Sequence, residues 1–452
     1  MPDLSNLPPA RWLRRGLRWL KPLRWKATLA RVGVLAALAG IGAFGFITLG
    51  LTPIAADDGH WRATRAFLEY TMTRTVRRQS AGVEVPALDD PDLVLRGAGH
   101  YAGGCVPCHG APGEPRSRVV RHMVPEPPYL PEEVADWNAA EMFWIVRHGL
   151  KYTAMPAWPS QVRDDEVWAM VAFLKRLPAL EPDGYRALAF GDAAADGGRS
   201  GLPHSGLASA NLPVLADCTR CHGRDGRGRG SGAAPRLAGQ DRAYLLDSLR
   251  AYAGGGRHSG IMQPVAGALD ARQIARLADH YAGLPATTAA PPGTPDPVLL
   301  ARGAALARGG SGPRRIPACT HCHRPDGASV RPGYPVLAGQ HGDYLALQLR
   351  LFRGGHRGGG PYAELMRHAA ANLADDDIEA LSAYYASRPS MPAAAQHTPP
   401  PVAPPGGQDA GQRPPRGKMR FFVAKKPACA CRSSTSGRSR KPPPTRNSPA
   451  TS

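Results

Sequence analysis

A five-residue pattern, Cys-x-x-Cys-His, occurs three times in this chain and constrains it more than any other feature. It occupies residues 105–109, 218–222 and 319–323. Two thiols one helical turn apart can each form a thioether with a vinyl group of one porphyrin, and the His that follows points at the iron. The pattern therefore predicts three covalently bound haem c groups, with attachment residues Cys105, Cys108, Cys218, Cys221, Cys319 and Cys322 and proximal ligands His109, His222 and His323.

Other uses of paired cysteines fit less well. A zinc ribbon needs two Cys pairs or further His at set spacings, and here each pair would have to borrow ligands from about 100 residues away. A thioredoxin-like pair belongs in a βαβ context, whereas these segments have helical patterns. Disulfides within each pair would explain neither the adjacent His nor the threefold recurrence.

Methionine is the expected sixth ligand, because its thioether raises the reduction potential and closes the iron to outside ligands. Met262 and Met366 are each the only Met between their motif and the end of their segment, 40 and 43 residues after the motif His. Met155 follows His109 by 46 residues, in a loop before a predicted helix. The expected iron ligands are therefore His109 with Met155, His222 with Met262, and His323 with Met366.

The first segment also contains Met123, Met142 and Met170. Met142 and Met170 sit inside helical patterns beside Trp, where Met usually fills a core. Several histidines lie outside the motifs and are expected on the surface or in packing, with axial ligation as the alternative. They are His100, His122, His148, His258, His280, His356 and His368.

Changes in Pro, Gly and Ala density divide the middle of the chain into three blocks, which we expect to be domains at 57–190, 212–286 and 296–390. The second and third blocks are an internal repeat, since Leu-Ala-Gly-Gln at 237–240 recurs at 337–340. Apolar spacing predicts helices over 91–101, 164–177, 272–281 and 376–385. No segment has a convincing strand pattern, so the fold class is all-α.

An uncharged run over residues 32–56 follows a basic segment at 1–31. As a helix it is long enough to cross a bilayer, and the positive-inside bias places everything after it outside the cytoplasm. A cleaved signal peptide is the alternative, but the apolar run and its basic lead are both long for one. We expect a single-pass anchor in the cytoplasmic membrane with the haem blocks on the periplasmic side.

The net charge of +20 comes mainly from the two ends of the chain, which contribute +7 over residues 1–31 and +10 over 391–452. The blocks between carry no basic surplus of the kind that nucleic-acid binding needs, so no nucleic-acid partner is expected. The composition of 391–452, rich in Pro, Gly, Arg and Ser, predicts a disordered tail. Its Cys429 and Cys431 have no neighbouring His and are interpreted as thiols rather than a metal site.

With these motifs, residues 91–180, 212–286 and 296–390 each resemble a class I cytochrome c domain. The first, through Cys-His-Gly-Ala-Pro-Gly at 108–113 and Thr-Ala-Met-Pro-Ala-Trp at 153–158, is similar to single-haem domains of bacterial respiratory and dehydrogenase-linked cytochromes. The other two resemble tandem di-haem cytochromes in which Leu-Ala-Gly-Gln follows the motif. The resemblance implies, for each domain, an amino-terminal helix crossing a carboxy-terminal one. The second block departs from it, because residues before Cys218 are broken by Pro213, and its first helix is either missing or replaced by a neighbour.

The expected function is single-electron transfer in a respiratory chain. The donor would be a quinol-oxidising complex or a dehydrogenase, and the acceptor a terminal oxidase or a soluble cytochrome. The alternative is a haem enzyme such as a peroxidase, which needs one iron with an open sixth position. A suitably placed Met in every block favours the carrier.

Overall fold

The computed structural model describes residues 25–52, 54–55, 58–191, 214–286, 296–327 and 330–390. Within these ranges the chain is built from helices and loops, and its only β pairing is two isolated bridges. The all-α prediction is therefore confirmed. The predicted tail at 391–452 and most of the basic segment at 1–31 lie outside the described residues.

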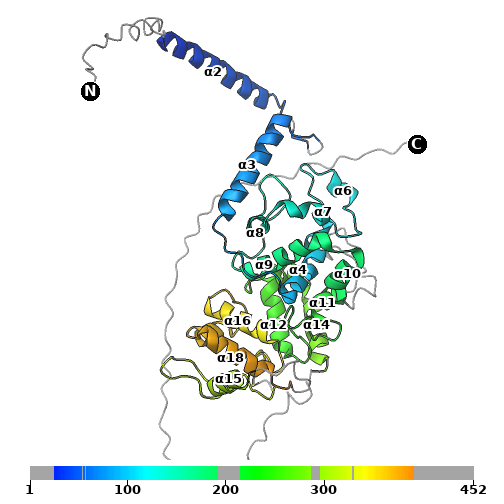
Figure 1. Cartoon of the computed structure of the whole chain (residues 1–452), viewed down its shortest axis with the longest axis vertical. Helices are drawn as coiled ribbons and strands as arrows, with labels where there is room; N and C mark the ends of the chain where they lie inside the picture. Colours follow the sequence, from blue (N-terminus) through cyan, green and yellow to red (C-terminus); the bar gives the residue numbers. More distant parts are fainter. Residues whose placement is uncertain are drawn as a thin grey trace, which may run out of the picture. The chain divides into compact units, whose positions relative to one another are not determined.

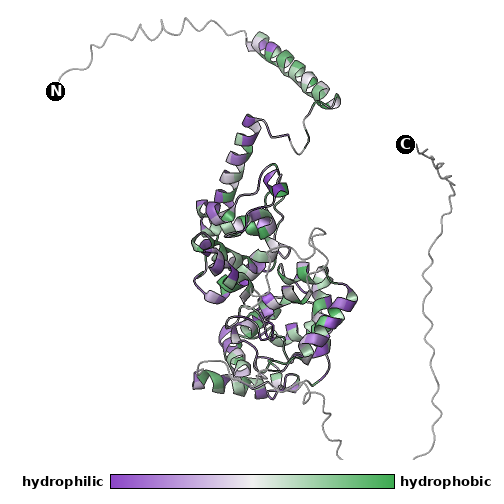
Figure 2. Cartoon of the chain, turned by 90° about the vertical axis from the view of Figure 1, so that its right-hand side faces the viewer, coloured by the Kyte–Doolittle hydropathy of each residue, from purple (hydrophilic) through white to green (hydrophobic). Residues whose placement is uncertain are grey.

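The first described element is the apolar helix α2, Trp25–Thr48. It begins and ends earlier than the predicted 32–56 span, because the helix continues back through Lys26 and Arg31 and stops at a glycine cap. Gly50 has φ of +68°, and Leu51 donates to the carbonyl of Phe46 at 3.1 Å, which is a Schellman termination. Figure 2 shows the helix as hydrophobic over most of its length. It is the one described helix long and apolar enough to cross a membrane, and a signal sequence would pass the same test.

The first block contains more of the described helices than either of the other two. Its predicted helices appear as α4 and α9, whereas α3 and α10 had no sequence prediction. In chain order its elements are α3 Arg62–Ser80, α4 Pro91–Gly104, α5 Val106–His109, α6 Arg118–Arg121, α7 Leu130–Glu133, η2 Val134–Asp136, α8 Ala139–His148, α9 Asp164–Arg176, η3 Leu177–Ala179 and α10 Pro182–Phe190.

Helices α4 and α9 cross closely, and their crossing organises the first core (Figure 1). Gly97 makes the approach possible, because a Cβ there would lie 2.2 Å from the carbonyl oxygen of Ala169. Beside the crossing, Tyr101 and Phe173 are fully buried, with ring centroids 5.0 Å apart. This crossing agrees with the architecture that the resemblance implied.

The third block repeats that arrangement with α15 and α18 (Figure 1). Helix α18 is the helix predicted over 376–385. Gly303 takes the part of Gly97, because its Cβ would lie 2.0 Å from the carbonyl oxygen of Ala380. The elements of this block are α15 Pro297–Gly309, η5 Cys319–His321, α16 Gly342–Arg353, α17 Ala363–Ala370 and α18 Asp375–Ala386.

The second block has a closing helix but no described helix ahead of its motif segment. Its elements are α11 Val214–His222, α12 Arg242–Ala253, α13 Met262–Gly267 and α14 Ala271–Gly283. Helix α4 of the first block lies against α11 instead: a Cβ on Gly99 would be 2.8 Å from Cys221 Sγ, and one on Gly103 would be 2.4 Å from the Arg220 guanidinium. Further along, Asp92 accepts hydrogen bonds from the backbone and hydroxyl of Ser231, at 3.1 and 2.6 Å. Residues 192–213, which precede the motif segment, lie outside the described residues, so the choice between a missing first helix and one replaced by a neighbour stays open.

Candidate haem-binding sites

The three motif histidines share one hydrogen-bond arrangement. The Nδ1 atoms of His109, His222 and His323 lie 3.0, 3.0 and 3.1 Å from the carbonyl oxygens of Pro128, Pro235 and Pro335. A carbonyl oxygen can only accept, so Nδ1 carries the proton and Nε2 of each neutral ring keeps a free lone pair. Fixing the tautomer and ring orientation in this way is what a metal-binding His requires.

The protonation of these histidines fits the same use. Burial lowers the pKa of His109, His222 and His323, and the hydrogen bonds to the Pro carbonyls oppose that effect. The rings are therefore neutral around pH 7, the form in which imidazole binds iron.

Each pair has a first thiol in apolar surroundings. Burial, followed by the neighbouring Cys108, raises the pKa of Cys105 to about 12. Burial likewise raises the pKa of Cys218 to about 12 and that of Cys319 to about 11. Such surroundings suit the hydrophobic edge of a porphyrin, and all six motif cysteines are free of disulfides.

The third motif opens on a cavity of about 150 Å³. Cys319, His323 and Met366 all line it, so the structure brings together one of the two predicted attachment residues and both predicted iron ligands of this site, whereas Cys322 is not among the lining residues. Much of the remaining wall is apolar, including Leu345, Leu349, Phe352, Leu381 and Tyr385. A porphyrin could be held there between a His and a Met with water excluded.

Arg257 is the most buried of the three arginines that line the cavity. It is 5% exposed and donates to hydroxyl and amide groups, Ser248 at 3.0 Å, Tyr344 at 3.2 Å, Gln348 at 3.4 Å and Tyr244 at 3.5 Å. Within the described residues it forms no ion pair. A buried cation without an anion is costly, so the site fits a ligand that brings carboxylates, as the propionates of haem do.

The other two predicted methionines occupy defined local positions. Met155 lies in a loop that folds back on the end of α8, with its carbonyl accepting from Leu150 N at 3.2 Å. Met262 is the first residue of α13, and its N–H donates to Ser259 Oγ at 2.9 Å. All three methionines are partly buried.

The competing candidates have other roles. Met142 and Met170 are buried in the first core, as expected for packing residues. His368 is 68% exposed and contacts Glu364 at 3.1 Å. His100 packs against Trp158, with ring centroids 4.8 Å apart.

Sequence reasoning missed the proline carbonyls and Arg257. Pro235 and Pro335 do carry a signal, since both fall on the 100-residue shift of the repeat, 13 and 12 residues after their motif His. Pro128 follows His109 by 19 residues and has no such mark. Arg257 also falls on this shift, since Arg357 stands 100 residues later, but its burial depends on the packing of the second block against the third, which the sequence does not show.

Two family models match the chain. "Cytochrome C oxidase, cbb3-type, subunit III" matches residues 92–174, and "Cytochrome c" matches residues 301–388. These ranges contain the first and third motifs.

Relatives align over most of their own length. The thiosulfate dehydrogenase electron acceptor of Thiomonas intermedia is 36% identical over 196 residues, which are 42% of this chain and 88% of that protein. Cytochrome c4 of Pseudomonas aeruginosa is 38% identical over 189 residues, 41% of this chain and 92% of that protein. The solved structure of Acidithiobacillus ferrooxidans cytochrome c4 is 34% identical, with a TM-score of 0.34, and the match covers 38% of this chain and 99% of that one. The chain therefore belongs to the c-type cytochromes, electron-transfer proteins that bind haem c covalently.

Proposed function

We propose that this cytochrome is a membrane-anchored carrier with three haems, one in each of the blocks 57–190, 212–286 and 296–390. The attachment pairs would be Cys105/Cys108, Cys218/Cys221 and Cys319/Cys322. The iron ligands would be His109 with Met155, His222 with Met262, and His323 with Met366.

The hydrogen bond from His Nδ1 to a Pro carbonyl is the observation that carries the count of three. It recurs at all three motifs with distances of 3.0, 3.0 and 3.1 Å. It includes His222, whose block lies outside both family-model ranges. A motif that arose by chance or had lost its haem would have no reason to keep its His in the metal-binding tautomer.

A bound haem supplies a reversible one-electron couple at its iron. The chain's own residues determine what that couple can do. A Met thioether at the sixth position favours the reduced state and excludes substrates, and an apolar wall limits water and so the solvent response to the change in charge. Electron transfer without catalysis is what these residues support.

Helix α2 supports an anchor with the haem blocks on the periplasmic side. The donor would be a quinol-oxidising complex or a dehydrogenase, and the acceptor a terminal oxidase or a soluble cytochrome. The relatives named as thiosulfate dehydrogenase electron acceptors favour a dehydrogenase of an inorganic sulfur compound as the donor to try first.

Intact mass spectrometry of the matured protein tests the haem count. We expect three covalent haems, and Cys218→Ala/Cys221→Ala should remove one while leaving the other two. A mature wild-type protein with two haems would overturn the assignment for the motif that lacks one.

Carbon monoxide binding tests the methionine ligands. The reduced wild-type protein should not bind it, because each sixth position is filled, and replacement of Met155, Met262 or Met366 by Ala should open one iron each. Met170→Leu, a change in the first core, is the matched control and should leave all three closed. Stoichiometric binding to the wild-type protein would favour a haem enzyme for the open block.

A further inference from the structure

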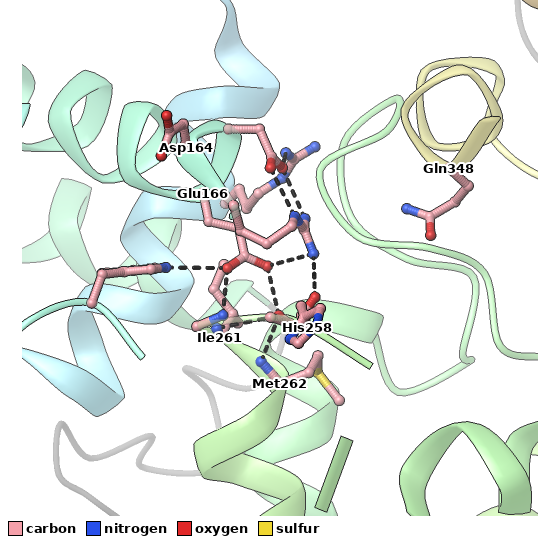
Figure 3. Close-up of polar contacts among 12 residues, drawn as sticks. Asp164, Glu166, His258, Ile261, Met262 and Gln348 are labelled. Atoms are coloured by element: carbon pink, nitrogen blue, oxygen red, sulfur yellow. Dashed lines mark hydrogen bonds and ion pairs between the residues drawn. The ribbon is translucent and has the colours of Figure 1, made fainter. Parts of the chain in front are cut away.

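The first block contacts the segment just before Met262 through one buried carboxylate, Glu166 of α9 (Figure 3). Glu166 is 3% exposed, and Ser259, which it contacts, is 2% exposed. We propose that Glu166 positions the Met262 loop, defined here as residues 258–262, so that methionine ligation of the second haem depends on the first block. This inference rests on the proposed function, because it takes Met262 as an iron ligand.

The carboxylate of Glu166 accepts three hydrogen bonds and forms one ion pair. Oε1 accepts from Ser259 Oγ at 2.6 Å and lies 2.9 Å from Arg163 Nη1, its ion-pair partner. Oε2 accepts from the backbone N–H of Gly260 at 2.5 Å and from Trp158 Nε1 at 3.2 Å. Two of these donors belong to the Met262 loop, and only an ionised carboxylate offers two acceptor oxygens to four donors.

The contact to Ser259 passes directly to Met262. The single hydroxyl proton of Ser259 is donated to Glu166, which leaves the oxygen free to accept from the backbone N–H of Met262 at 2.9 Å and of Ile261 at 3.3 Å. Glu166 therefore sets the orientation of the hydroxyl that holds the amide of the proposed ligand. Figure 3 shows Glu166, Ile261 and Met262 grouped around this chain of hydrogen bonds.

Arg163 and Trp158 complete the attachment of the loop to the first block. Arg163 donates to the carbonyl of His258 at 3.0 Å and is fixed by a bidentate pair with Asp165, both distances 2.8 Å. Trp158 lies so close to Gly260 that a Cβ there would be 2.0 Å from its Nε1. Ile261 packs against the first core. Each of the loop residues 258–261 thus contacts the first block, as in a docked segment.

The Met155 loop depends less on Glu166. It is held within its own block by Leu150 N to Met155 O at 3.2 Å, Met155 N to Thr153 Oγ1 at 3.1 Å and Trp158 N to Arg147 O at 3.0 Å. Loss of the Glu166 carboxylate leaves these bonds in place. We therefore expect its effect to fall on the second haem rather than the first.

Carbon monoxide binding to the full-length, matured protein tests the proposal, together with the long-wavelength sulfur-to-iron band of the ferric state. Glu166→Gln keeps the size of the side chain but offers one acceptor oxygen, so two of the four donors face an NH₂ group. We expect it to open one iron to carbon monoxide and to lose the same share of the sulfur-to-iron band as Met262→Ala. Asp164→Asn is the matched control, since Asp164 lies in the same helical turn and pairs with Arg147 in a half-exposed position.

A second combination assigns the effect to one haem. In a background of Cys218→Ala/Cys221→Ala, which removes the second haem, Glu166→Gln should open no iron. Ser259→Ala is the second variant, because it breaks the same link while keeping the ion pair between Arg163 and Glu166, and it should weaken the band in the same haem. If Glu166→Gln does not yield a haem protein, Ser259→Ala decides the matter.

The outcomes separate the two proposals. If Met262→Ala opens one iron but Glu166→Gln and Ser259→Ala leave every iron closed and the band intact, Glu166 is not a positioning residue, while the ligand assignment stands. If Met262→Ala opens no iron, the ligand assignment itself is wrong, and the positioning role falls with it.

Discussion

Gln240 and Gln340 lie one hundred residues apart and bind each other's blocks through the same hydrogen bonds. Gln240 accepts from Val336 N at 2.6 Å and donates to Val336 O at 2.9 Å, while Gln340 accepts from Arg236 N at 2.9 Å and donates to Arg236 O at 2.9 Å. Both amide oxygens also accept from the next backbone N–H of their own block. The repeated Leu-Ala-Gly-Gln sequence is therefore an interface motif, and it pairs the second block with the third by approximate twofold symmetry.

Replacing either glutamine should loosen this interface. Gln240→Ala leaves the N–H and C=O of Val336 buried without partners, which costs about 1–3 kcal/mol. Gln340→Ala should lower the free energy of unfolding by a similar amount. Denaturant titrations followed by haem absorption measure both losses. The double variant should lose less than the two single losses added together, because the two side chains stabilise one interface. Strict additivity would mean that the two hydrogen-bond sets act independently.

The crossing of α15 and α18 should not tolerate a methyl group at Gly303. A Cβ there would lie 2.0 Å from the backbone carbonyl of Ala380, and the helices can only separate to admit it. Gly303→Ala should lower the stability of the third block by about 1–3 kcal/mol, the usual cost of overpacking. Gly309→Ala is the matched control in the same helix, with no atom within 4 Å of its Cβ, and it should match or slightly exceed wild-type stability in the same denaturant titration.

Acid should destabilise the protein partly through His100. Burial and the charge of Arg220 lower the pKa of His100 to about 4. The unfolded chain binds this proton near pH 6.5, so folding loses stability as the pH falls from about 6.5 towards 4, by up to about 3 kcal/mol from this residue. His100→Asn should flatten the decline in unfolding free energy between pH 7 and pH 4.5.

The exposed His368 provides the comparison for that experiment. His368→Gln removes a histidine whose side chain is 68% exposed, so the pH dependence should stay as in the wild-type protein. An unchanged decline in His100→Asn would show that His100 is not kept neutral by the fold.

Removing the buried cation on the cavity wall should shift a haem potential. A positive charge near an iron disfavours the ferric state, so Arg257→Gln should lower the potential of the neighbouring haem by some tens of millivolts, as Coulomb's law predicts at an intermediate dielectric constant. Spectroelectrochemical titration measures it. Arg250→Gln, in the exposed last turn of α12, should leave all potentials in place, and equal shifts in the two variants would rule out a specific role for Arg257.

The sequence alone predicted the features that depend on local pattern. The three motifs, the closing helices and the loop position of Met155 all follow from spacing along a few turns of chain. Family matches and relatives confirm the c-type cytochrome family and its electron transfer, whereas the ligand sets and the count of three stay predictions. The helix lies at Trp25–Thr48 rather than at the predicted 32–56. The uncharged run shows where charge is absent, but the ends of the helix depend on its capping residues.

Features that depend on contacts between distant residues could not be predicted in this way. Glu166 looks like one acid among three at the start of a helix, and nothing in its neighbours shows that Ser259, 93 residues later, lies against it. Helix α3 was missed because few of its residues are buried, so its apolar spacing is weak. Arg257 recurs as Arg357 in the repeat, but its burial shows only when the third block covers it.

Helix α4 has glycines on opposite faces, and this limits how such a chain can change by gene duplication or loss. Gly97 admits α9 of its own block, while Gly99 and Gly103 admit Cys221 and Arg220 of the next. Deleting the first block would strip the second motif of the wall against which it is built, and copying the second block alone would produce a haem pocket open on one side. The first two blocks would therefore be duplicated or lost together in evolution, even though each motif has its own complete haem-attachment sequence.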